Sequence, residues 1–269
     1  MKGRHFFGFL VILCGGILVP FSTAQWGPAH DELRSGIQSF NQSKYDEAIA
    51  HLEKVLELDP SNNKAHFYLA RAYAQHYVPG VDKPDNVANA ERAIEHYQKV
   101  IDIGASRFDS KTAAKDVAHL YTYLGKFDEA KDYCARAKQL DVNDAEPYYT
   151  IGVIDWTVAS QFREQERAKL GMKPEESLAA KDKKICVKVR EKNWDNLGEG
   201  IDNLNQALQM EPAYADAMTQ MSLLYRERAD LRCEDPAVRK ADLKTAEEWQ
   251  TKALATKKSN AAKAKTPEE

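Results

Sequence analysis

Residues 45–60 read YDEAIAHLEKVLELDP, a single amphipathic helix that ends at a proline. Residues 127–142, FDEAKDYCARAKQLDV, and residues 198–212, GEGIDNLNQALQMEP, repeat the pattern. In each stretch the apolar positions are three or four residues apart, so that they share one face of a helix. Such a helix cannot bury that face alone, and its recurrence predicts a chain built of repeated helical units.

A small residue marks the second half of each unit, and an apolar or small residue follows seven positions later. The small residues are Ala48, Ala93, Ala130, Gly200 and Ala246. Seven positions later stand Val55, Val100, Ala137, Ala207 and Ala253. Small residues on a helix face let a second helix approach closely. We therefore expect five pairs of antiparallel helices and no β-sheet.

An upstream helix precedes each small residue, and unit three shows it without a gap. There Ala118 and Tyr121 are followed by a turn at 124–126 and then by Phe127. The pattern resembles the tetratricopeptide repeat, a unit of about 34 residues with the motif W-x2-L-G-x2-Y, then A-x3-F, then P. The resemblance covers residues 29–255 and implies an all-α, right-handed α-solenoid of about five helix pairs.

The match to the motif is imperfect. No unit carries the Trp of the family, and Asp155 stands where the family prefers Tyr. In unit one the apolar residues Leu33, Ile37 and Phe40 lie one step from the expected core row. This offset predicts that the first helix of unit one is rotated or acts partly as a cap. The expected core row holds Glu32, Ser35 and Ser39.

Insertions explain why the small residues are 45, 37, 70 and 46 residues apart. In unit two the extra residues are predicted to form a loop at 77–86, and in unit five they surround 233–238. Unit four is predicted to contain an elongated helical hairpin, with a degenerate sixth repeat as the alternative, its small position at Glu164 or Glu166. The predicted units span 29–62, 63–107, 111–144, 145–214 and 215–255.

Both ends of the chain differ from the repeats. Residues 1–24 have a basic start, an apolar stretch and small residues at their end, which predicts a signal peptide cleaved after Ala24. An uncleaved anchor and a lipoprotein modified on Cys14 are the alternatives. Mass spectrometry separates cleavage from lipidation, because the mature chain would begin at Gln25 or at a diacylated cysteine. Residues 256–269 are rich in Lys and Ala without an apolar stripe and are predicted to form a disordered tail.

The composition, 43% hydrophobic and 29% charged, is typical of a globular protein. Loss of Lys2 and Arg4 with the signal peptide leaves 36 basic and 41 acidic residues, a formal charge of -5, which gives no basis for nucleic-acid binding. The chain contains no Gly-rich phosphate loop and no H-E-x-x-H, C-x-x-C or G-x-S-x-G motif. The seven histidines show no metal-ligand spacing. We therefore predict neither an enzyme nor a metal or cofactor site.

Three cysteines remain after signal cleavage. Cys134 falls on the core face of unit three, where a small buried hydrophobic residue is expected. Cys186 and Cys233 lie in the insertions of adjacent units, and such insertions emerge on the same edge of a solenoid. We therefore expect a disulfide, or at least proximity, between these two residues, which requires Cα atoms within about 7 Å.

The resemblance also implies a concave groove, lined by the first helices, in which the family binds a peptide or protein segment. By register, the inward row of side chains consists of Phe67, Arg71, Lys115, His119, Tyr123, Tyr149, Val153, Trp156, Leu223 and Arg226. Aromatic residues beside arginine are common in binding hot spots. Tyr149 and Trp156 have an alternative role, in packing against the inserted hairpin.

Together these features predict an exported, non-catalytic protein–protein interaction scaffold of a bacterial envelope, periplasmic or secreted, with no membrane span after signal cleavage. The chain is similar to uncharacterised secreted bacterial proteins with tetratricopeptide repeats. The alternative is a lipid-anchored subunit of an outer-membrane assembly or a pilus machine.

Overall fold

The computed structural model describes residues 27–173 and 176–264, which form eleven helices and no strand. The predicted signal peptide, its cleavage site and Cys14 lie outside the described residues, as do residues 265–269 of the predicted tail. No described helix is long and apolar enough to cross a membrane.

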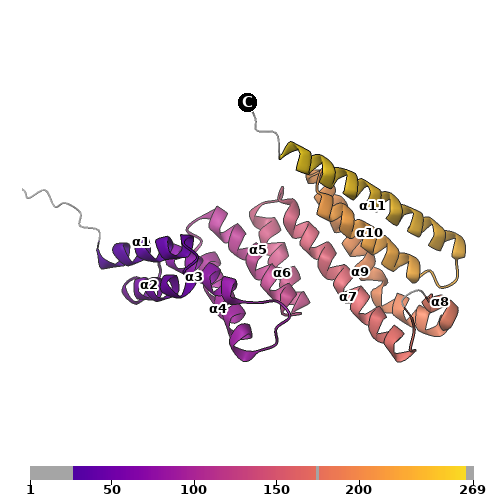
Figure 1. Ribbon diagram of the computed structural model, residues 1–269, viewed down its shortest axis with the longest axis horizontal. Coiled ribbons are helices and arrows are strands. Elements are labelled where there is room, and N and C mark those ends of the chain that lie inside the picture. Colours follow the sequence, from indigo (N-terminus) through magenta and orange to yellow (C-terminus); the bar gives the residue numbers. More distant parts are fainter. Residues whose placement is uncertain (1–26, 174–175, 265–269) are drawn as a thin grey trace, which may run out of the picture.

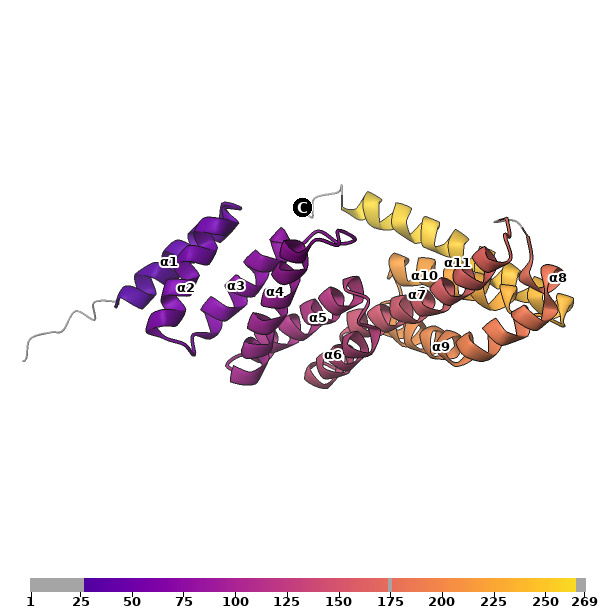
Figure 2. The ribbon, with the colours of Figure 1, turned by 90° about the horizontal axis from the view of Figure 1, so that it is seen from below.

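All helices except the short α8 form five pairs, which follow one another along the long axis of the molecule (Figures 1 and 2). The pairs are α1 (Pro28–Asn41) with α2 (Tyr45–Leu58), α3 (Asn63–His76) with α4 (Pro84–Ile103), α5 (Arg107–Tyr123) with α6 (Phe127–Leu140), α7 (Ala145–Lys169) with α9 (Lys183–Met210), and α10 (Ala215–Asp230) with α11 (Pro236–Lys263). This arrangement confirms the predicted all-α solenoid of five helix pairs.

The small residues that define the repeat lie in the core between paired helices. All of them are buried, as are the residues seven positions later, of which Val55, Val100, Ala137 and Ala207 are 0% exposed. Glycines of the first helices allow a close approach to the second helices. A Cβ atom on Gly152 of α7 would come within 2.6 Å of Leu204 Cγ on α9. The helices can therefore approach so closely only because the side chain is absent.

Helix α1 corrects one expectation from the sequence. The apolar stripe is only half-buried, whereas the buried residues of the helix are Ser39, from the expected core row, and Gly36, which follows Ser35. A Cβ atom on Gly36 would lie 2.7 Å from Leu52 Cγ. Small residues are sufficient on this row because α1 packs directly onto α2. Of the apolar residues one step over, Leu33 and Phe40 pack against the first core, and Ile37 is half-buried.

The insertions lengthen helices more than they lengthen loops. In unit two α4 begins at Pro84, so the loop is shorter than the predicted 77–86. The side chain of Asn86 fixes this loop, accepting a hydrogen bond from the Val78 N–H at 2.8 Å and donating to the carbonyl oxygens of Val78 and Val81. In unit five the extra residues extend α11, which begins at Pro236 with Asp235 as its N-cap.

Unit four contains the predicted hairpin. Helix α7 is continuous from Ala145 to Lys169, and α9 returns from Lys183 to Met210. The short helix α8 (Leu178–Lys181) lies in the connection between them (Figure 1). Glu164 and Glu166 lie within α7, so neither marks the second helix of a sixth repeat.

The predicted disordered tail is wrong for the residues that the structure describes, because α11 continues to Lys263. Alanine and lysine are good helix formers. The end of α11 also docks onto the start of unit five. Lys257 Nζ lies 2.9 Å from Asp216 Oδ1, and the Asn260 side chain donates to the carbonyl oxygen of Ala213 at 3.2 Å.

A buried ion pair joins the two halves of the solenoid, whose hydrophobic cores lie mainly in α1–α6 and in α7–α11. Asp155 of α7 is 1% exposed, and Lys131 Nζ of α6 lies 2.5 Å from its Oδ1 and 2.9 Å from Glu199 Oε2 on α9. Burial raises the pKa of Asp155 to about 6, against the opposing effect of Lys131. Burial disfavours the charged form of Lys131, but the two carboxylates outweigh it and raise the lysine pKa.

Candidate partner-binding groove

The predicted row of side chains lies on α3, α5, α7 and α10, the first helices of units two to five. Within each helix its members are three or four residues apart and share a face distinct from the one that meets the second helix. Most residues of the row line one of two cavities, the first between α3 and α5 and the second between α7 and α10. We call them the α3–α5 cavity and the α7–α10 cavity.

The predicted residues that line the α3–α5 cavity are Phe67, Arg71, His119 and Tyr123. The guanidinium carbon of Arg71 lies 4.8 Å from the ring centroid of Phe40 and 5.7 Å from that of Phe67. The rings of Tyr123 and Tyr77 are 6.5 Å apart, and Tyr123 is 58% exposed. Arg71 makes no ion pair with any residue that the structure describes. The cavity therefore combines accessible aromatic surface with free N–H donors.

The α3–α5 cavity also holds an acidic residue, Asp116. Burial raises the pKa of its carboxyl group, although the Tyr97 hydroxyl, His119 and Arg71 all favour the charged form. Lys115, one position away, is engaged elsewhere. Its Nζ lies 3.0 Å from Asp144 Oδ2 and 2.5 Å from Glu146 Oε2. Burial disfavours the charge of Lys115, but these carboxylates outweigh it and raise the pKa. Lys115 thus joins units three and four and lines neither cavity.

The predicted residues that line the α7–α10 cavity are Trp156, Leu223 and Arg226. Met172, just beyond α7, also lines the cavity. Beside Trp156, Arg163 donates through Nε to both carboxylate oxygens of Glu227, at 2.8 and 2.9 Å. Burial raises the pKa of Glu227, which is 2% exposed, and Arg163 acts in the opposite direction.

Besides Lys115, two further residues of the predicted row, Tyr149 and Val153, line neither cavity. The ring of Tyr149 lies 5.0 Å from that of Tyr214, which precedes α10, and burial raises the Tyr149 pKa. Tyr149 therefore packs against the residue that precedes α10, whereas its predicted alternative role was to pack against the inserted hairpin. Val153 is half-buried. Trp156 packs partly against the second core while still facing the α7–α10 cavity.

The sequence reasoning missed the contribution of unit one. Leu33, Ile37 and Phe40 occupy the same register on α1 as the predicted row does on the other first helices, and all three are half-buried. The ring of Phe40 lies 5.4 Å from that of Tyr68 on α3 and forms the platform for Arg71. In the sequence this contribution is visible as an apolar stripe one step from the core row of α1. The stripe extends the apolar row of the first helices to α1.

The described residues contain no cluster of three or more His, Cys, Asp or Glu that could hold a metal ion. The closest histidines are His66 and His96, whose Nδ1 atoms lie 3.0 Å apart. Burial, and then the nearby His66, lower the pKa of His96 to about 4. The ring of His96 stacks on that of Tyr73, so the pair acts as a packed contact between α3 and α4.

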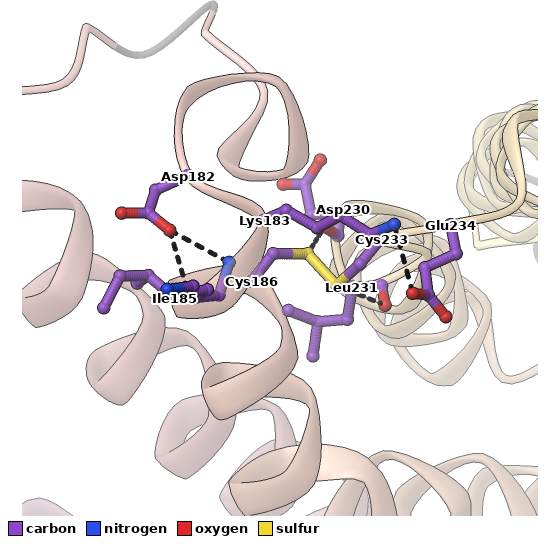
Figure 3. The surroundings of a disulfide bond; sticks show 9 residues. Asp182, Lys183, Ile185, Cys186, Asp230, Leu231, Cys233 and Glu234 are labelled. Atoms are coloured by element: carbon purple, nitrogen blue, oxygen red, sulfur yellow. Dashed lines mark hydrogen bonds and ion pairs between the residues drawn. A yellow bond between two sulfur atoms is a disulfide. The ribbon is translucent and has the colours of Figure 1, made fainter.

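Cys186 and Cys233 form a disulfide with Cα atoms 5.8 Å apart (Figure 3). Cys186 lies in the first turn of α9, which Asp182 caps, and Cys233 lies in the turn between α10 and α11. Both cysteines are buried. The ion pair between Lys183 Nζ and Glu234 Oε1, at 3.2 Å, spans the same junction. The hairpin of unit four is thereby fastened to unit five. Cys134 is buried in the first core, as expected.

Comparisons with known proteins agree with this architecture. A family model described as TPR repeat matches residues 39–76, and one described as Tetratricopeptide repeat matches residues 116–144. No curated protein matches the sequence.

Several solved structures share the fold. MamA protein is 16% identical, with a TM-score of 0.56 over 90% of this chain and 98% of its own. The structure "MamA 41-end from Desulfovibrio magneticus RS-1" is 15% identical, with a TM-score of 0.55 over 86% and 96%. YrrB, described as a TPR protein with an unusual peptide-binding site, is 16% identical, with a TM-score of 0.52 over 86% and 92%. At these identities the similarity concerns the fold alone. The repeat motif, the two matched segments and the stacked helix pairs together support a tetratricopeptide-repeat solenoid.

Proposed function

We propose that the protein is an exported, non-catalytic scaffold that binds a segment of another protein along the face formed by its first helices. One observation carries the proposal. The predicted row assembles into two cavities, each of which places an arginine that lacks an ion pair among the described residues beside aromatic side chains. Trp, Tyr and Arg are the residues that most often dominate binding energy at protein interfaces. The peptide-binding site in the description of YrrB is consistent with such a use of the fold.

The disulfide supports the exported location. Disulfides persist in oxidising compartments such as the bacterial periplasm and are rare in the cytosol. The bond between Cys186 and Cys233 is buried and fastens two units of the solenoid. A structural role of this kind fits a chain that is secreted through the predicted signal peptide and matures in the envelope.

Substitution in the groove tests the proposal. We expect Arg71→Ala and Trp156→Ala each to reduce partner capture by a tagged mature chain at least about tenfold, because loss of a hot-spot side chain costs about 2 kcal/mol or more. Capture from the envelope fraction is quantified by mass spectrometry against the unaltered chain. Arg92→Ala is the matched control, because Arg92 also lies over a ring, that of Tyr73, but on the outer helix α4.

The variants must keep the thermal midpoint of the unaltered chain for the comparison to hold. If stable Arg71→Ala and Trp156→Ala variants capture the same proteins in the same amounts, the groove is not the binding site. The hairpin of unit four would then be the better candidate surface.

A further inference from the structure

The charged residues that line the α7–α10 cavity are unequally partnered. Its acidic members are Glu164, Glu227 and Asp230, and its basic members are Arg163, Arg167 and Arg226. Each acidic residue has an arginine partner. Arg163 Nε lies 2.8 Å from Glu227 Oε1, Arg167 Nε lies 3.8 Å from Glu164 Oε2, and Arg239 Nη2, from outside the cavity, lies 3.9 Å from Asp230 Oδ1. The negative charge of the cavity is therefore already matched within the protein.

Arg226 differs from the other two arginines. Arg167 donates from its guanidinium to the carbonyl oxygens of Glu176 and Lys173, at 2.8 and 2.5 Å, and so closes the end of the hairpin. Arg226 is exposed and makes no ion pair or side-chain hydrogen bond with any residue that the structure describes. Arg226 thus carries a positive charge that no acidic residue of the cavity matches. Its planar guanidinium suits a carboxylate, which can accept two parallel hydrogen bonds.

Arg226 shares the cavity with apolar as well as charged side chains. Trp156, Leu223 and Met172 line the same cavity, and all three are half-buried. An ion pair gains strength where apolar groups exclude water, whereas an exposed pair contributes little. A carboxylate that arrives together with an apolar side chain would meet both conditions, because the apolar group covers Trp156 and Leu223 while the carboxylate reaches Arg226.

We propose, on the basis of the groove function above, that the α7–α10 cavity binds a glutamate or aspartate flanked by an apolar residue in the partner segment, with Arg226 as its counter-ion. The charge that the cavity leaves unmatched selects an acidic residue. A basic residue at this place would meet Arg226 and would find each acidic side chain already paired.

A short peptide tests the cavity separately from the natural partner. The probe is Ac-Leu-Glu-Leu-Ala-NH2, with the Gln and Lys analogues as matched neutral and basic peptides. Binding to the mature chain is followed by NMR through the indole N–H signal of Trp156, assigned from its absence in Trp156→Phe. We expect the Glu peptide to shift this signal with a Kd at least about tenfold below that of the Gln analogue, since the pair is charge-assisted. The Lys analogue should leave the signal in place.

Arg226→Gln should remove the preference for Glu over Gln, and Arg226→Lys should retain part of it. Arg136→Gln, on the outer helix α6, should leave the preference unchanged. Equal binding of the Glu and Gln peptides, a preference for Lys, or a preference that survives Arg226→Gln would overturn the inference. Each of these results leaves the groove function standing if the partner still depends on Arg71 and Trp156.

Discussion

Replacing Lys131 with methionine is expected to lower the free energy of unfolding by about 3 to 5 kcal/mol, because it leaves a buried carboxylate without its cation. Asp155, on α7, is 1% exposed, and Lys131 is the cation that contacts it across the junction of the two cores. Methionine is an unbranched side chain of similar length to lysine and lacks the ammonium group. Denaturant unfolding followed by circular dichroism measures the loss.

The effect of pH on Lys131→Met gives a second, independent signature. Asp155 has a pKa of about 6 in the folded chain, whereas the ordinary pKa of an aspartate carboxyl group is 3.8. The folded chain therefore binds a proton that the unfolded chain does not, so this group stabilises fully below about pH 3.8 and loses that contribution as the pH rises through about 6. Without Lys131 the folded pKa rises further, so the deficit at pH 7 should shrink at pH 5.

Two variants serve as controls for the ion pair. Lys99→Met, on the exposed face of α4, should change the free energy of unfolding by less than about 0.5 kcal/mol at either pH. Asp155→Asn combined with Lys131→Met should abolish the dependence on pH between 5 and 7 that is specific to the single variant. A Lys131→Met chain as stable as the unaltered protein at pH 7 would show that the pair does not hold the junction.

Removal of the disulfide is expected to destabilise the chain by a similar amount. Cys186 and Cys233 are 47 residues apart in the sequence, and the chain-entropy estimate for a loop of this length is about 4 kcal/mol. We expect Cys186→Ser with Cys233→Ser to lower the free energy of unfolding by about that much. The loss should fall on units four and five, because the bond joins the start of α9 to the turn before α11 (Figure 3).

The reductant provides the control for the disulfide prediction. Dithiothreitol should destabilise the unaltered chain and leave the double serine variant unchanged. Thiol titration of the unreduced mature chain in denaturant should find one free thiol, that of Cys134. Three titratable thiols, or a stability that does not respond to reductant, would contradict both the bond and the support that it lends to export.

The helix pairs could be predicted because their determinants are local. Each small residue and the residue seven positions later sit on one helix, and their spacing alone places them in the core, as Ala48 and Val55 show. The disulfide followed from the same reasoning, because the repeat fixes which edge of the solenoid carries the insertions. The hairpin of unit four could be expected from the apolar stripe that continues along α9.

What the sequence could not show depends on neighbouring units. Leu33, Ile37 and Phe40 have the composition of a core row, and only the close approach of Gly36 to Leu52 shows that the core lies one step away. The end of α11 is helical partly because Asn260 reaches Ala213, a contact far away in the sequence.

The candidate groove shows the same limit. Its register could be read from the repeat, and Arg71, Trp156 and Arg226 of the predicted row line cavities in the structure. Register does not show which charges are neutralised by the next unit, as Lys115 is by Glu146. That distinction separates arginines available to a partner from charges used within the fold.

Site-specific photo-crosslinking in the intact envelope tests the central claim, that the first-helix face binds another protein, most directly. The photoreactive p-benzoylphenylalanine replaces Tyr123 on α5 or Leu223 on α10, and in control chains it replaces the exposed Lys99 on α4 or Gln206 on α9. We predict that the two groove positions give an adduct of the same protein and that the two outer positions give none of it. An adduct formed from the outer positions, with none from the groove, would contradict the account.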